Sequence, residues 1–258
     1  MKDAALVVDG VTLRYGTGEK SVLALDTVSL NIRPNEFTVI VGPSGCGKSS
    51  LLYLVAGLQE VTSGQILVSG KAVDGPGPDR GMVFQSYTLF PWLTVRNNIE
   101  YGLKRKGIAP GERRKIVDRY VQEVGLSGFA DHYPKQLSGG MMQRVAIARA
   151  MANDPVILLM DEPFGALDSQ TRHTMQKLLL RVWEHEQKTV CFVTHDIDEA
   201  ILLGDRVLVM TARPGKIKEE VMITIPRPRS PDIALEPEFI ALKRRIIALL
   251  ATEIDEEH

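Results

Sequence analysis

The chain has 258 residues, of which 31 are basic and 32 are acidic, and this length predicts one large domain or a domain with a subdomain. The balance of charge argues against a nucleic-acid partner or a polybasic membrane patch. The N-terminus lacks an apolar stretch of signal-peptide length, and no run approaches the ~18 apolar residues of a membrane span, so we expect a cytoplasmic chain with Cys46 and Cys191 reduced.

The N-terminal third predicts strands around one helix. Short alternating or apolar runs separated by turns extend from residue 4 to about 41, among them "ALVVDGVTLRY", "VSLNI" and "FTVIVG". Helical spacing follows in "KSSLLYLVAGL", then a hairpin pattern in "TSGQILVSGKAV" and a short strand pattern in "GMVFQ". The order is therefore strand, loop, helix and sheet again.

From residue 94 the pattern changes to three helical segments with no strand signal between them: "TVRNNIEYGLKRKG", "GERRKIVDRYVQEVGL" and "GMMQRVAIARAMAND". Apolar strands then alternate with helices: "VILLMDEP", a helix over 168–187, "KTVCFVTH", a helix over 196–203, and "DRVLVMT". One more strand pattern, a proline-rich bend "IPRPRSP" and a charged amphipathic helix from about residue 237 end the chain. These patterns predict a parallel-sheet α/β core with an inserted helical subdomain.

A glycine-rich loop follows the predicted strand "FTVIV". The stretch "GPSGCGKSS", residues 42–50, matches the pattern G-x-x-x-x-G-K-[ST] between a strand and a helix. Glycines let successive backbone N–H groups point at phosphates, and the helix N-terminus adds its dipole. Lys48 can neutralise the β- and γ-phosphates, and the Ser49 hydroxyl can bind Mg²⁺. The loop predicts ATP and Mg²⁺ as cofactors.

Two carboxylates, Asp161 and Glu162, end the apolar run "VILLM". A buried parallel strand would bring them to the same edge of the sheet as the glycine-rich loop. We expect Asp161 to hold Mg²⁺ through water and Glu162 to act as general base on the attacking water. An apolar run that ends in acids is common, so this interpretation depends on the phosphate loop upstream.

Four further side chains have a functional and a structural interpretation each. His195 follows "TVCFVT" and is expected to reach the γ-phosphate, or else to be a core histidine or a cap partner of Asp196. Gln85 is expected to meet Mg²⁺ or the water, although a glutamine by itself indicates surface. Tyr15 either stacks on adenine or packs on the sheet. Asp168 either contributes to the nucleotide site or caps a helix.

A second glycine-rich loop, "QLSGGMMQR" at residues 136–144, also precedes a helical pattern. Such a helix N-terminus is suited to gripping phosphate, yet the chain already has a complete phosphate loop. Two opposed helix N-termini in one compact core cannot meet the same γ-phosphate. We therefore expect Ser138, Gly139 and Gly140 to bind the ATP that another copy of the chain holds.

In chain order, "GPSGCGKSS", "FQ", "LSGGMMQR", "VILLMDEP", "ALD" and "TH" resemble the Walker A, Q-loop, signature, Walker B, D-loop and H-loop motifs of ABC-type ATPases, over residues 15 to 195. The resemblance implies an α/β fold: a P-loop NTPase (RecA-like) parallel-sheet core with an N-terminal antiparallel β subdomain and an inserted helical subdomain. The site residues it implies are, for catalysis, Glu162, His195 and Gln85; for the metal, Ser49, Gln85 and Asp161; and for the nucleotide, Tyr15, Gly42, Pro43, Ser44, Gly45, Cys46, Gly47, Lys48, Ser49, Ser50, Ser138, Gly139, Gly140 and Asp168.

The same resemblance implies one ABC ATPase domain over 1–258. We expect a nucleotide-binding core with its β subdomain at 1–93 and 155–225, a helical signature subdomain at 94–154, and a tail helix within 226–258. One departure is Met141, which stands where the family's signature most often has glutamine. Methionine donates no hydrogen bond, so only backbone donors remain at that position.

The resemblance also implies partners. We expect a homodimer on the inner face of the cell membrane, beneath integral membrane permease subunits, with an external solute-binding protein. An apolar cluster beside the Q-loop is expected to line a groove for a cytoplasmic helix of the permease, or else to cover the joint between subdomains. The cluster consists of Leu89, Phe90, Trp92 and Leu93.

The segments "MTARPGKI" and "IPRPR", without a large added domain after residue 225, resemble ATPase subunits of nitrate, sulfonate and taurine importers. The function implied is ATP hydrolysis at a homodimer interface that drives uptake of a small anionic solute. The alternatives are a non-transport ABC-type ATPase, similar to DNA-repair or translation factors, and an importer subunit for another solute.

Overall fold

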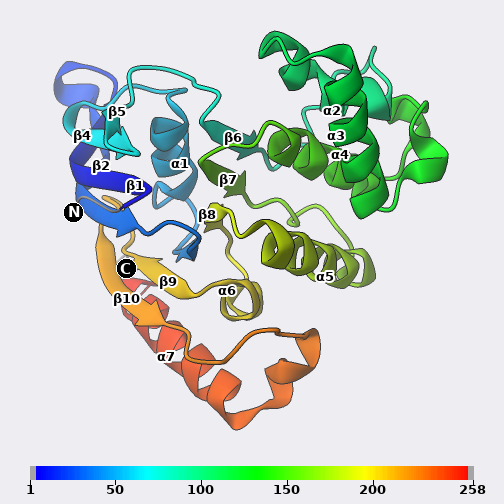
Figure 1. Ribbon diagram of the computed structural model, residues 1–258. Helices are drawn as coiled ribbons and strands as arrows, with labels where there is room; N and C mark the ends of the chain where they lie inside the picture. Colours follow the sequence, from blue (N-terminus) through cyan, green and yellow to red (C-terminus); the bar gives the residue numbers. More distant parts are fainter. Residues whose placement is uncertain (1–3, 255–258) are drawn as a thin grey trace.

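The computed structural model describes residues 4–254, which form two β-sheets and seven α-helices (Figure 1). One apolar core lies between the smaller sheet, helix α1 (Lys48–Ala56) and one face of the larger sheet. A second core lies on the other face of the larger sheet and extends among the remaining helices. Among the described residues, no helix combines the length and apolarity needed to cross a membrane.

The larger sheet has six strands in the order β10-β9-β3-β8-β7-β6, and all neighbours are parallel except the pair of β10 and β9. Every residue of β3, β7, β8 and β9 is buried, as expected for parallel strands covered on both faces. Their carboxyl ends meet at one edge. The strands are β3 (Phe37–Val41), β6 (Arg80–Val83), β7 (Ile157–Asp161), β8 (Thr189–Val193), β9 (Arg206–Met210) and β10 (Ile217–Met222).

The smaller sheet is antiparallel, with the strand order β2-β1-β4-β5. Buried side chains alternate along much of β1, since one face packs on α1 and the other does not. The predicted N-terminal antiparallel subdomain is confirmed. Its strands are β1 (Leu6–Tyr15), β2 (Val22–Ile32), β4 (Ser63–Val68) and β5 (Lys71–Ala72).

The predicted inserted helices are α2 (Val95–Arg105), α3 (Pro110–Glu123) and α4 (Gly139–Ala152), which lie together at one end of the larger sheet (Figure 1). Asn98 on α2 is fully buried and holds the loop before the helix. Its amide nitrogen donates to the carbonyl oxygens of Phe90, Leu93 and Thr94, and its oxygen accepts from the Phe90 N–H at 2.9 Å.

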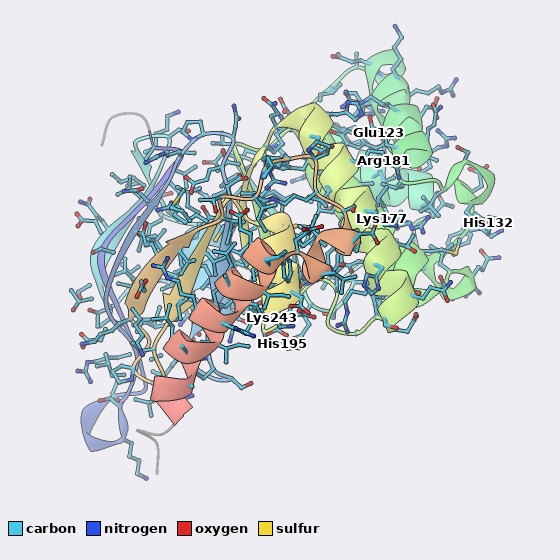
Figure 2. All side chains as sticks on the ribbon, turned by 90° about the horizontal axis from the view of Figure 1, so that it is seen from below. Glu123, His132, Lys177, Arg181, His195 and Lys243 are labelled. Carbon is cyan, nitrogen blue, oxygen red and sulfur yellow. The ribbon has the colours of Figure 1, made fainter. Side chains whose placement is uncertain are left out.

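The last helices are α5 (Ser169–Glu186), α6 (Ile197–Leu203) and α7 (Pro237–Ile254). Seen from below, Lys243 on α7 lies close to the H-loop region (Figure 2), where its ammonium pairs with Asp198 on α6 at 2.7 Å. The proline-rich bend before α7 carries Arg229, which is buried and donates to the carbonyl oxygens of Ile201 and Gly204 at the end of α6. Burial lowers the pKa of Arg229 to about 10. The C-terminal tail therefore contacts α6 through Arg229 and Lys243.

The predicted fold class is confirmed by this arrangement. The subdomain boundaries at 1–93 with 155–225, 94–154 and 226–258 stay a proposal, and residues 1–3 and 255–258 lie outside the described residues. Cys46 and Cys191, both described, are buried and form no disulfide.

Candidate functional site

The Walker A loop connects β3 to α1 and surrounds the Lys48 ammonium. Gly47 has a φ of +105°, and a Cβ atom there would lie 2.7 Å from Leu25 Cδ2, so the position requires glycine. Lys48 donates to the carbonyl oxygens of Gly42 and Pro43, each at 2.8 Å. The buried ammonium thus lies inside the loop, at the place where a phosphate group would need a positive charge.

A cavity of about 520 Å³ opens over this loop. Tyr15 is 44% exposed at its edge, and its hydroxyl is hydrogen-bonded to Ser50 Oγ at 3.0 Å and donates to Gln59 Oε1 at 3.1 Å. A partly exposed ring at a cavity wall is suited to stacking on a flat base. The lining residues are Tyr15, Val22, Ala24, Ser44, Gly45, Gly47, Lys48, Ser49, Ser50, Glu162 and Arg213.

Arg213 adds a second positive charge that the sequence analysis missed. Its guanidinium donates to the Gly45 carbonyl oxygen at 3.2 Å, across 168 residues of sequence. Arg213 lies in the segment "MTARPGKI", which entered the sequence analysis only as part of the family resemblance. Nothing in the local pattern places this segment beside the Walker A loop. Cys46, by contrast, is buried, so only its backbone can face a phosphate.

Asp161 ends β7 with its carboxylate held by two residues of α1. Ser49 Oγ donates to Asp161 Oδ1 at 2.7 Å, so the two residues that were expected to hold Mg²⁺ lie side by side. Tyr53, a residue that the sequence analysis missed, donates its hydroxyl to Asp161 Oδ2 at 2.9 Å. Burial, with a smaller contribution from this hydrogen bond, raises the pKa of Tyr53 to about 12, so the phenol remains a donor at neutral pH.

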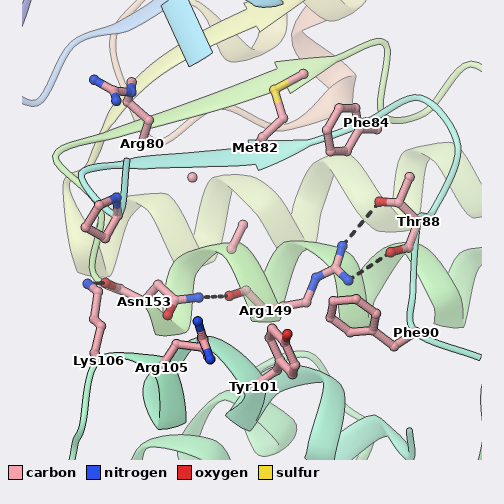
Figure 3. Close-up of a pocket in the computed structure, with 14 residues that line it drawn as sticks. Arg80, Met82, Phe84, Thr88, Phe90, Tyr101, Arg105, Lys106, Arg149 and Asn153 are labelled. Carbon is pink, nitrogen blue, oxygen red and sulfur yellow. Dashed lines mark hydrogen bonds between the residues drawn. The ribbon is translucent and has the colours of Figure 1, made fainter. Parts of the chain in front are cut away.

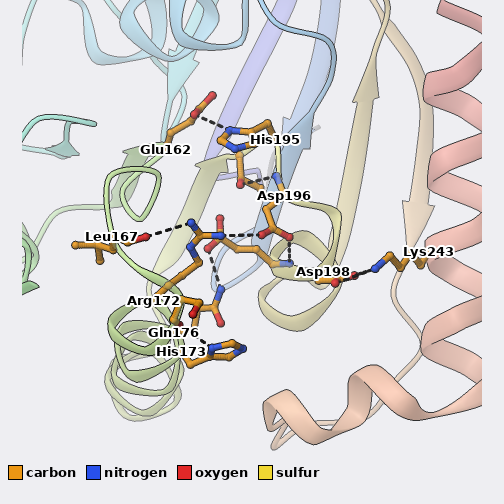
Figure 4. A network of polar contacts seen from close by, with 12 residues as sticks. Glu162, Leu167, Arg172, His173, Gln176, His195, Asp196, Asp198 and Lys243 are labelled. Atoms are coloured by element: carbon orange, nitrogen blue, oxygen red, sulfur yellow. Dashed lines mark hydrogen bonds and ion pairs between the residues drawn. The ribbon is translucent and has the colours of Figure 1, made fainter. Parts of the chain in front are cut away.

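Glu162 adopts a left-handed conformation with a φ of +41°, and its Oε2 lies 2.8 Å from His195 Nδ1 (Figure 4). Because a carboxylate only accepts hydrogen bonds, Nδ1 carries the proton and Nε2 is the other hydrogen-bonding atom of the ring. The His195 side chain is 60% exposed, so the core-histidine interpretation is wrong.

Gln85 lies in the loop after β6, close to Glu162. A Cβ atom on Gly165 would lie 3.7 Å from Glu162 Oε2 and 3.8 Å from Gln85 Nε2, so both side chains approach this glycine. Gln85 is exposed, and its role at the nucleotide or the water stays a prediction. The predicted Q-loop, Walker B and H-loop side chains therefore meet at one edge of the sheet.

Arg172 joins the D-loop to the turn that carries His195 (Figure 4). Its guanidinium donates to the Leu167 carbonyl oxygen at 3.2 Å and to Asp196 Oδ2 at 3.3 Å. Asp196 in turn caps α6 through its own side chain. Asp196 therefore needs no cap partner from His195. The sequence analysis missed the contact between Arg172 and Asp196, because the local pattern around each residue indicates only the start of a helix.

Two predicted nucleotide-binding side chains cap helices. Asp168 accepts a hydrogen bond from the Thr171 N–H at 3.0 Å and begins α5, which is the structural interpretation considered for it. Ser138 accepts from the Met141 N–H at 3.3 Å and begins α4. Any contact of either side chain with a nucleotide stays a prediction.

The signature loop opens on a different cavity, of about 360 Å³. A Cβ atom on Gly139 would lie 2.6 Å from the Tyr87 hydroxyl oxygen, and one on Gly140 would lie 2.6 Å from Thr171 Cγ2, so a side chain at either position would force its neighbour to move. The described lining of the Walker A cavity includes no residue of 138–140. Within one chain the two glycine-rich loops therefore face different cavities.

Comparison with known protein families identifies the family to which this set of motifs belongs. The family described as ABC transporter matches residues 25–165 of the chain. The chain belongs to the ABC transporter family. It is thus an ATP-binding cassette and an ATPase, and the fold and motif order above are those of its family.

Three relatives show the extent of the likeness. An uncharacterised ABC transporter ATP-binding protein of Methanocaldococcus jannaschii is 52% identical over 249 residues, which cover 96% of this chain and 92% of the relative. Nitrate import ATP-binding protein NrtD of Synechocystis is 49% identical, covering 92% and 91%. Bicarbonate transport ATP-binding protein CmpC of Synechococcus elongatus is 47% identical and covers 91% of this chain but 36% of that protein. The predicted resemblance to nitrate-importer ATPase subunits is confirmed.

Solved ABC cassettes share the architecture. The post-hydrolysis dimer of the ATP-binding cassette MJ0796, bound to ADP and Pi, superposes with a TM-score of 0.75 at 38% identity and covers 86% of this chain and 100% of that one. The cbiO1 subunit of Clostridium perfringens, part of the transporter complex cbiONQ, superposes with a TM-score of 0.77 at 29% identity, covering 96% and 99%.

Proposed function

We propose that this ABC ATPase is the ATP-hydrolysing subunit of an importer for a small anionic solute of the nitrate, aliphatic sulfonate or taurine class. The observation that carries the hydrolytic part of the proposal is the cavity over the Walker A loop with Glu162 in its wall. The 49% identity to a nitrate import ATP-binding protein over nearly the whole length of both chains supports the solute class.

Mg²⁺ fits the site beside the Walker A loop. Ser49 Oγ and Asp161 Oδ1 lie 2.7 Å apart, and both are oxygen donors of the kind that this hard cation prefers. Ser49 and Asp161 would hold the ion, Asp161 through water, and Gln85 would approach from its loop. The ion would neutralise charge on the β- and γ-phosphates of ATP.

The chain's own residues supply the remaining chemistry of hydrolysis. Lys48 exchanges its hydrogen bonds to loop carbonyl oxygens for bonds to phosphate oxygens. Glu162 takes the proton of the attacking water, and the hydrogen bond from His195 Nδ1 fixes the direction of its carboxylate. His195 donates from Nε2 to the γ-phosphate in its imidazolium form, which carries a proton on both ring nitrogens. The Tyr15 ring stacks on adenine.

The cassette works as a homodimer in this proposal. Each signature loop covers the ATP in the other copy, with Ser138 and the backbone N–H groups of Gly139 and Gly140 on the γ-phosphate. The separate cavities of the two loops within one chain support this arrangement. The related cassette MJ0796 is described as dimeric with its hydrolysis products bound.

A groove of about 650 Å³ beside the Q-loop would receive a cytoplasmic helix of a permease (Figure 3). The Phe90 ring lies 4.5 Å from the Tyr101 ring and 5.7 Å from that of Trp92, which is 69% exposed. Arg149 lies over Phe90 and donates to Thr88 (Figure 3). The lining residues are Pro78, Arg80, Gly81, Met82, Phe84, Thr88, Phe90, Tyr101, Gly102, Arg105, Lys106, Arg149, Ala150 and Asn153.

The groove is lined by aromatic, arginine and lysine side chains, and this lining suits an amphipathic helix that carries an acidic residue. Two residues of the predicted cluster support the permease interpretation, and one supports the alternative that the cluster covers the joint between subdomains. Phe90 lines the groove and Trp92 stands at the surface beside it, whereas Leu89 packs on the core. In the proposed complex the cassette lies on the inner face of the membrane, and an external solute-binding protein supplies the solute.

A transport assay tests the proposal. We expect deletion of the gene to abolish uptake of labelled nitrate, an alkanesulfonate or taurine, with rescue by the wild-type chain and none by Lys48→Ala. Unchanged uptake of all three solutes would make the solute class wrong. Failure of the tagged chain to copurify with any membrane permease would favour the non-transport ATPase.

A further inference from the structure

Two donors from one face of α1 hold the Asp161 carboxylate. Ser49 and Tyr53 are four residues apart, so their side chains project from the same side of the helix. Ser49 donates to Oδ1 at 2.7 Å and Tyr53 donates to Oδ2 at 2.9 Å. Asp161 is only 2% exposed, and each of its carboxylate oxygens has a donor from α1. These two bonds oppose rotation of the carboxylate.

Tyr53 also touches the wall of the groove beside the Q-loop. The ring centroids of Tyr53 and Phe84 are 6.2 Å apart, with 51° between the ring planes. Phe84 lines that groove and directly precedes Gln85. One side chain therefore contacts the groove wall through its ring and the Walker B carboxylate through its hydroxyl.

We propose that Tyr53 is a positioning residue that orients the Asp161 carboxylate for Mg²⁺ and couples that orientation to the groove wall through Phe84. The Ser49 oxygen can offer a lone pair to the ion while its hydroxyl still donates a hydrogen bond to Asp161 Oδ1. Tyr53 meanwhile keeps Oδ2 in place. A displacement of Phe84 would shift the Tyr53 ring, and its hydroxyl would carry the shift to the carboxylate.

This inference rests on the proposed use of Mg²⁺ with ATP, and it is independent of the solute and of the permease. The test uses the purified full-length chain and Mn²⁺, whose electron paramagnetic resonance signal reports free and bound ion. Tyr53→Phe removes the hydroxyl and keeps the ring against Phe84. We expect the affinity of the ATP-loaded chain for Mn²⁺ to fall about ten-fold, the size of effect that loss of a hydrogen bond to a charged group produces. ATP affinity in EDTA should stay unchanged.

A matched control separates this effect from general loss of a hydroxyl. Tyr120 donates its hydroxyl to the Met151 carbonyl oxygen at 3.2 Å between α3 and α4, away from the Walker A cavity. We expect Tyr120→Phe to leave Mn²⁺ affinity unchanged. Wild-type Mn²⁺ affinity in Tyr53→Phe would overturn the proposal. If that variant fails to fold, Tyr53→Leu provides the same measurement, because it also lacks the hydroxyl.

A double-mutant cycle tests the link to the groove. Phe84→Ala removes the ring beside Tyr53, and we expect it to weaken Mn²⁺ binding about three-fold in the wild-type background and not at all in Tyr53→Phe. Independent, multiplying losses would overturn the coupling and place the effect of Phe84 on its neighbour Gln85. A failed transport assay would leave these Mn²⁺ affinities as they are, so failure of the importer proposal and failure of this one are distinguishable.

Discussion

At the residue scale, the contact between Glu162 and His195 at the Walker A cavity yields a prediction about catalysis. Glu162→Gln keeps the shape of the side chain and removes its basicity. We expect hydrolysis to fall at least about 100-fold, which is the range for loss of a general base. ATP affinity should remain, so ATP-bound dimers should accumulate in size-exclusion chromatography with ATP and Mg²⁺.

Phosphate release measured under the same conditions decides this assignment. A wild-type rate in Glu162→Gln would mean that another group accepts the proton. Lys48→Ala is the contrasting variant, because it loses a charge-assisted contact to phosphate and should weaken ATP binding itself. It should therefore form no ATP-bound dimer, which distinguishes loss of binding from loss of chemistry.

The sequence predicted the site residues that are grouped in short motifs. It did not predict those whose contacts in the fold are distant in the sequence. The Walker A loop is local, since its glycines and Lys48 lie within seven residues. Tyr53 meets Asp161 across 108 residues and Arg213 meets Gly45 across 168. In the sequence Tyr53 is one more apolar position of a helix, and only the packing of α1 against β7 gives its hydroxyl a partner.

At the scale of elements, the end of α6 depends on an arginine from the proline-rich bend. Arg229 donates to the carbonyl oxygens of Ile201 and Gly204, and to that of Ile225 in its own segment. Arg229→Met would leave these buried acceptors without their donor. We expect the free energy of unfolding, measured by urea titration, to fall by about 3 kcal/mol.

Arg244 provides the control for this substitution, since it is exposed on α7. Arg244→Met should change the free energy of unfolding by no more than about 0.5 kcal/mol. Equal losses in the two variants would show that removal of a positive charge, and not the buried contacts at the end of α6, explains the effect.

The loop before α2 yields a prediction about the permease. Asn98 holds the backbone on both sides of Trp92 through hydrogen bonds to Phe90 and Leu93, and the Trp92 side chain is exposed. Trp92→Gln should keep ATP affinity, and the tagged variant should lose copurification with the permease, because an exposed aromatic is a typical anchor of an interface. Full retention of the permease would exclude Trp92 from the docking surface.

Element boundaries agreed with the sequence where periodicity was strong and differed at the edge of the sheet. The helix predicted at 168–187 is α5 at Ser169–Glu186. The strand predicted over "GMVFQ" ends at Val83, because β6 is an edge strand whose pairing with β7 stops at Val83 and Met160. Gln85 therefore lies in a loop, where its side chain can approach Glu162.

At the scale of the whole molecule, the layers could be predicted because each motif has a fixed place relative to a strand or helix. The buried apolar runs that form β7 and β8 predicted a parallel sheet. The helical pattern over residues 94–154 predicted a subdomain without strands, and the structure has none in this described stretch. The sequence predicted that the two glycine-rich loops serve different copies of the chain, but the cavity on which each loop opens depends on how α4 packs. The structure gives them separate cavities, which makes contact between copies testable.

A disulfide between chains tests the composite site. Cys46 is buried beneath its loop, so the exposed Ser44 is the better place for a thiol on the Walker A side. In a Cys46→Ala, Cys191→Ala background, one chain carries Ser44→Cys and a size tag, and the other carries Ser138→Cys. A disulfide requires Cα atoms within about 7 Å, so its formation is a distance measurement. We expect mild oxidation without nucleotide to give a mixed dimer on a non-reducing gel.

The mixture makes the outcome unambiguous, because each chain holds a single thiol and a tagged–untagged band can arise only between copies. ATP should reduce the band, since a nucleotide between the two loops keeps the thiols apart. The chain with both Ser44→Cys and Ser138→Cys is the counter-test. If its thiols disappear while it runs as a monomer and the mixture gives no band, the two loops close on each other within one chain. The shared ATP site would then be wrong, and the cassette would have to hydrolyse ATP without a contribution from its partner.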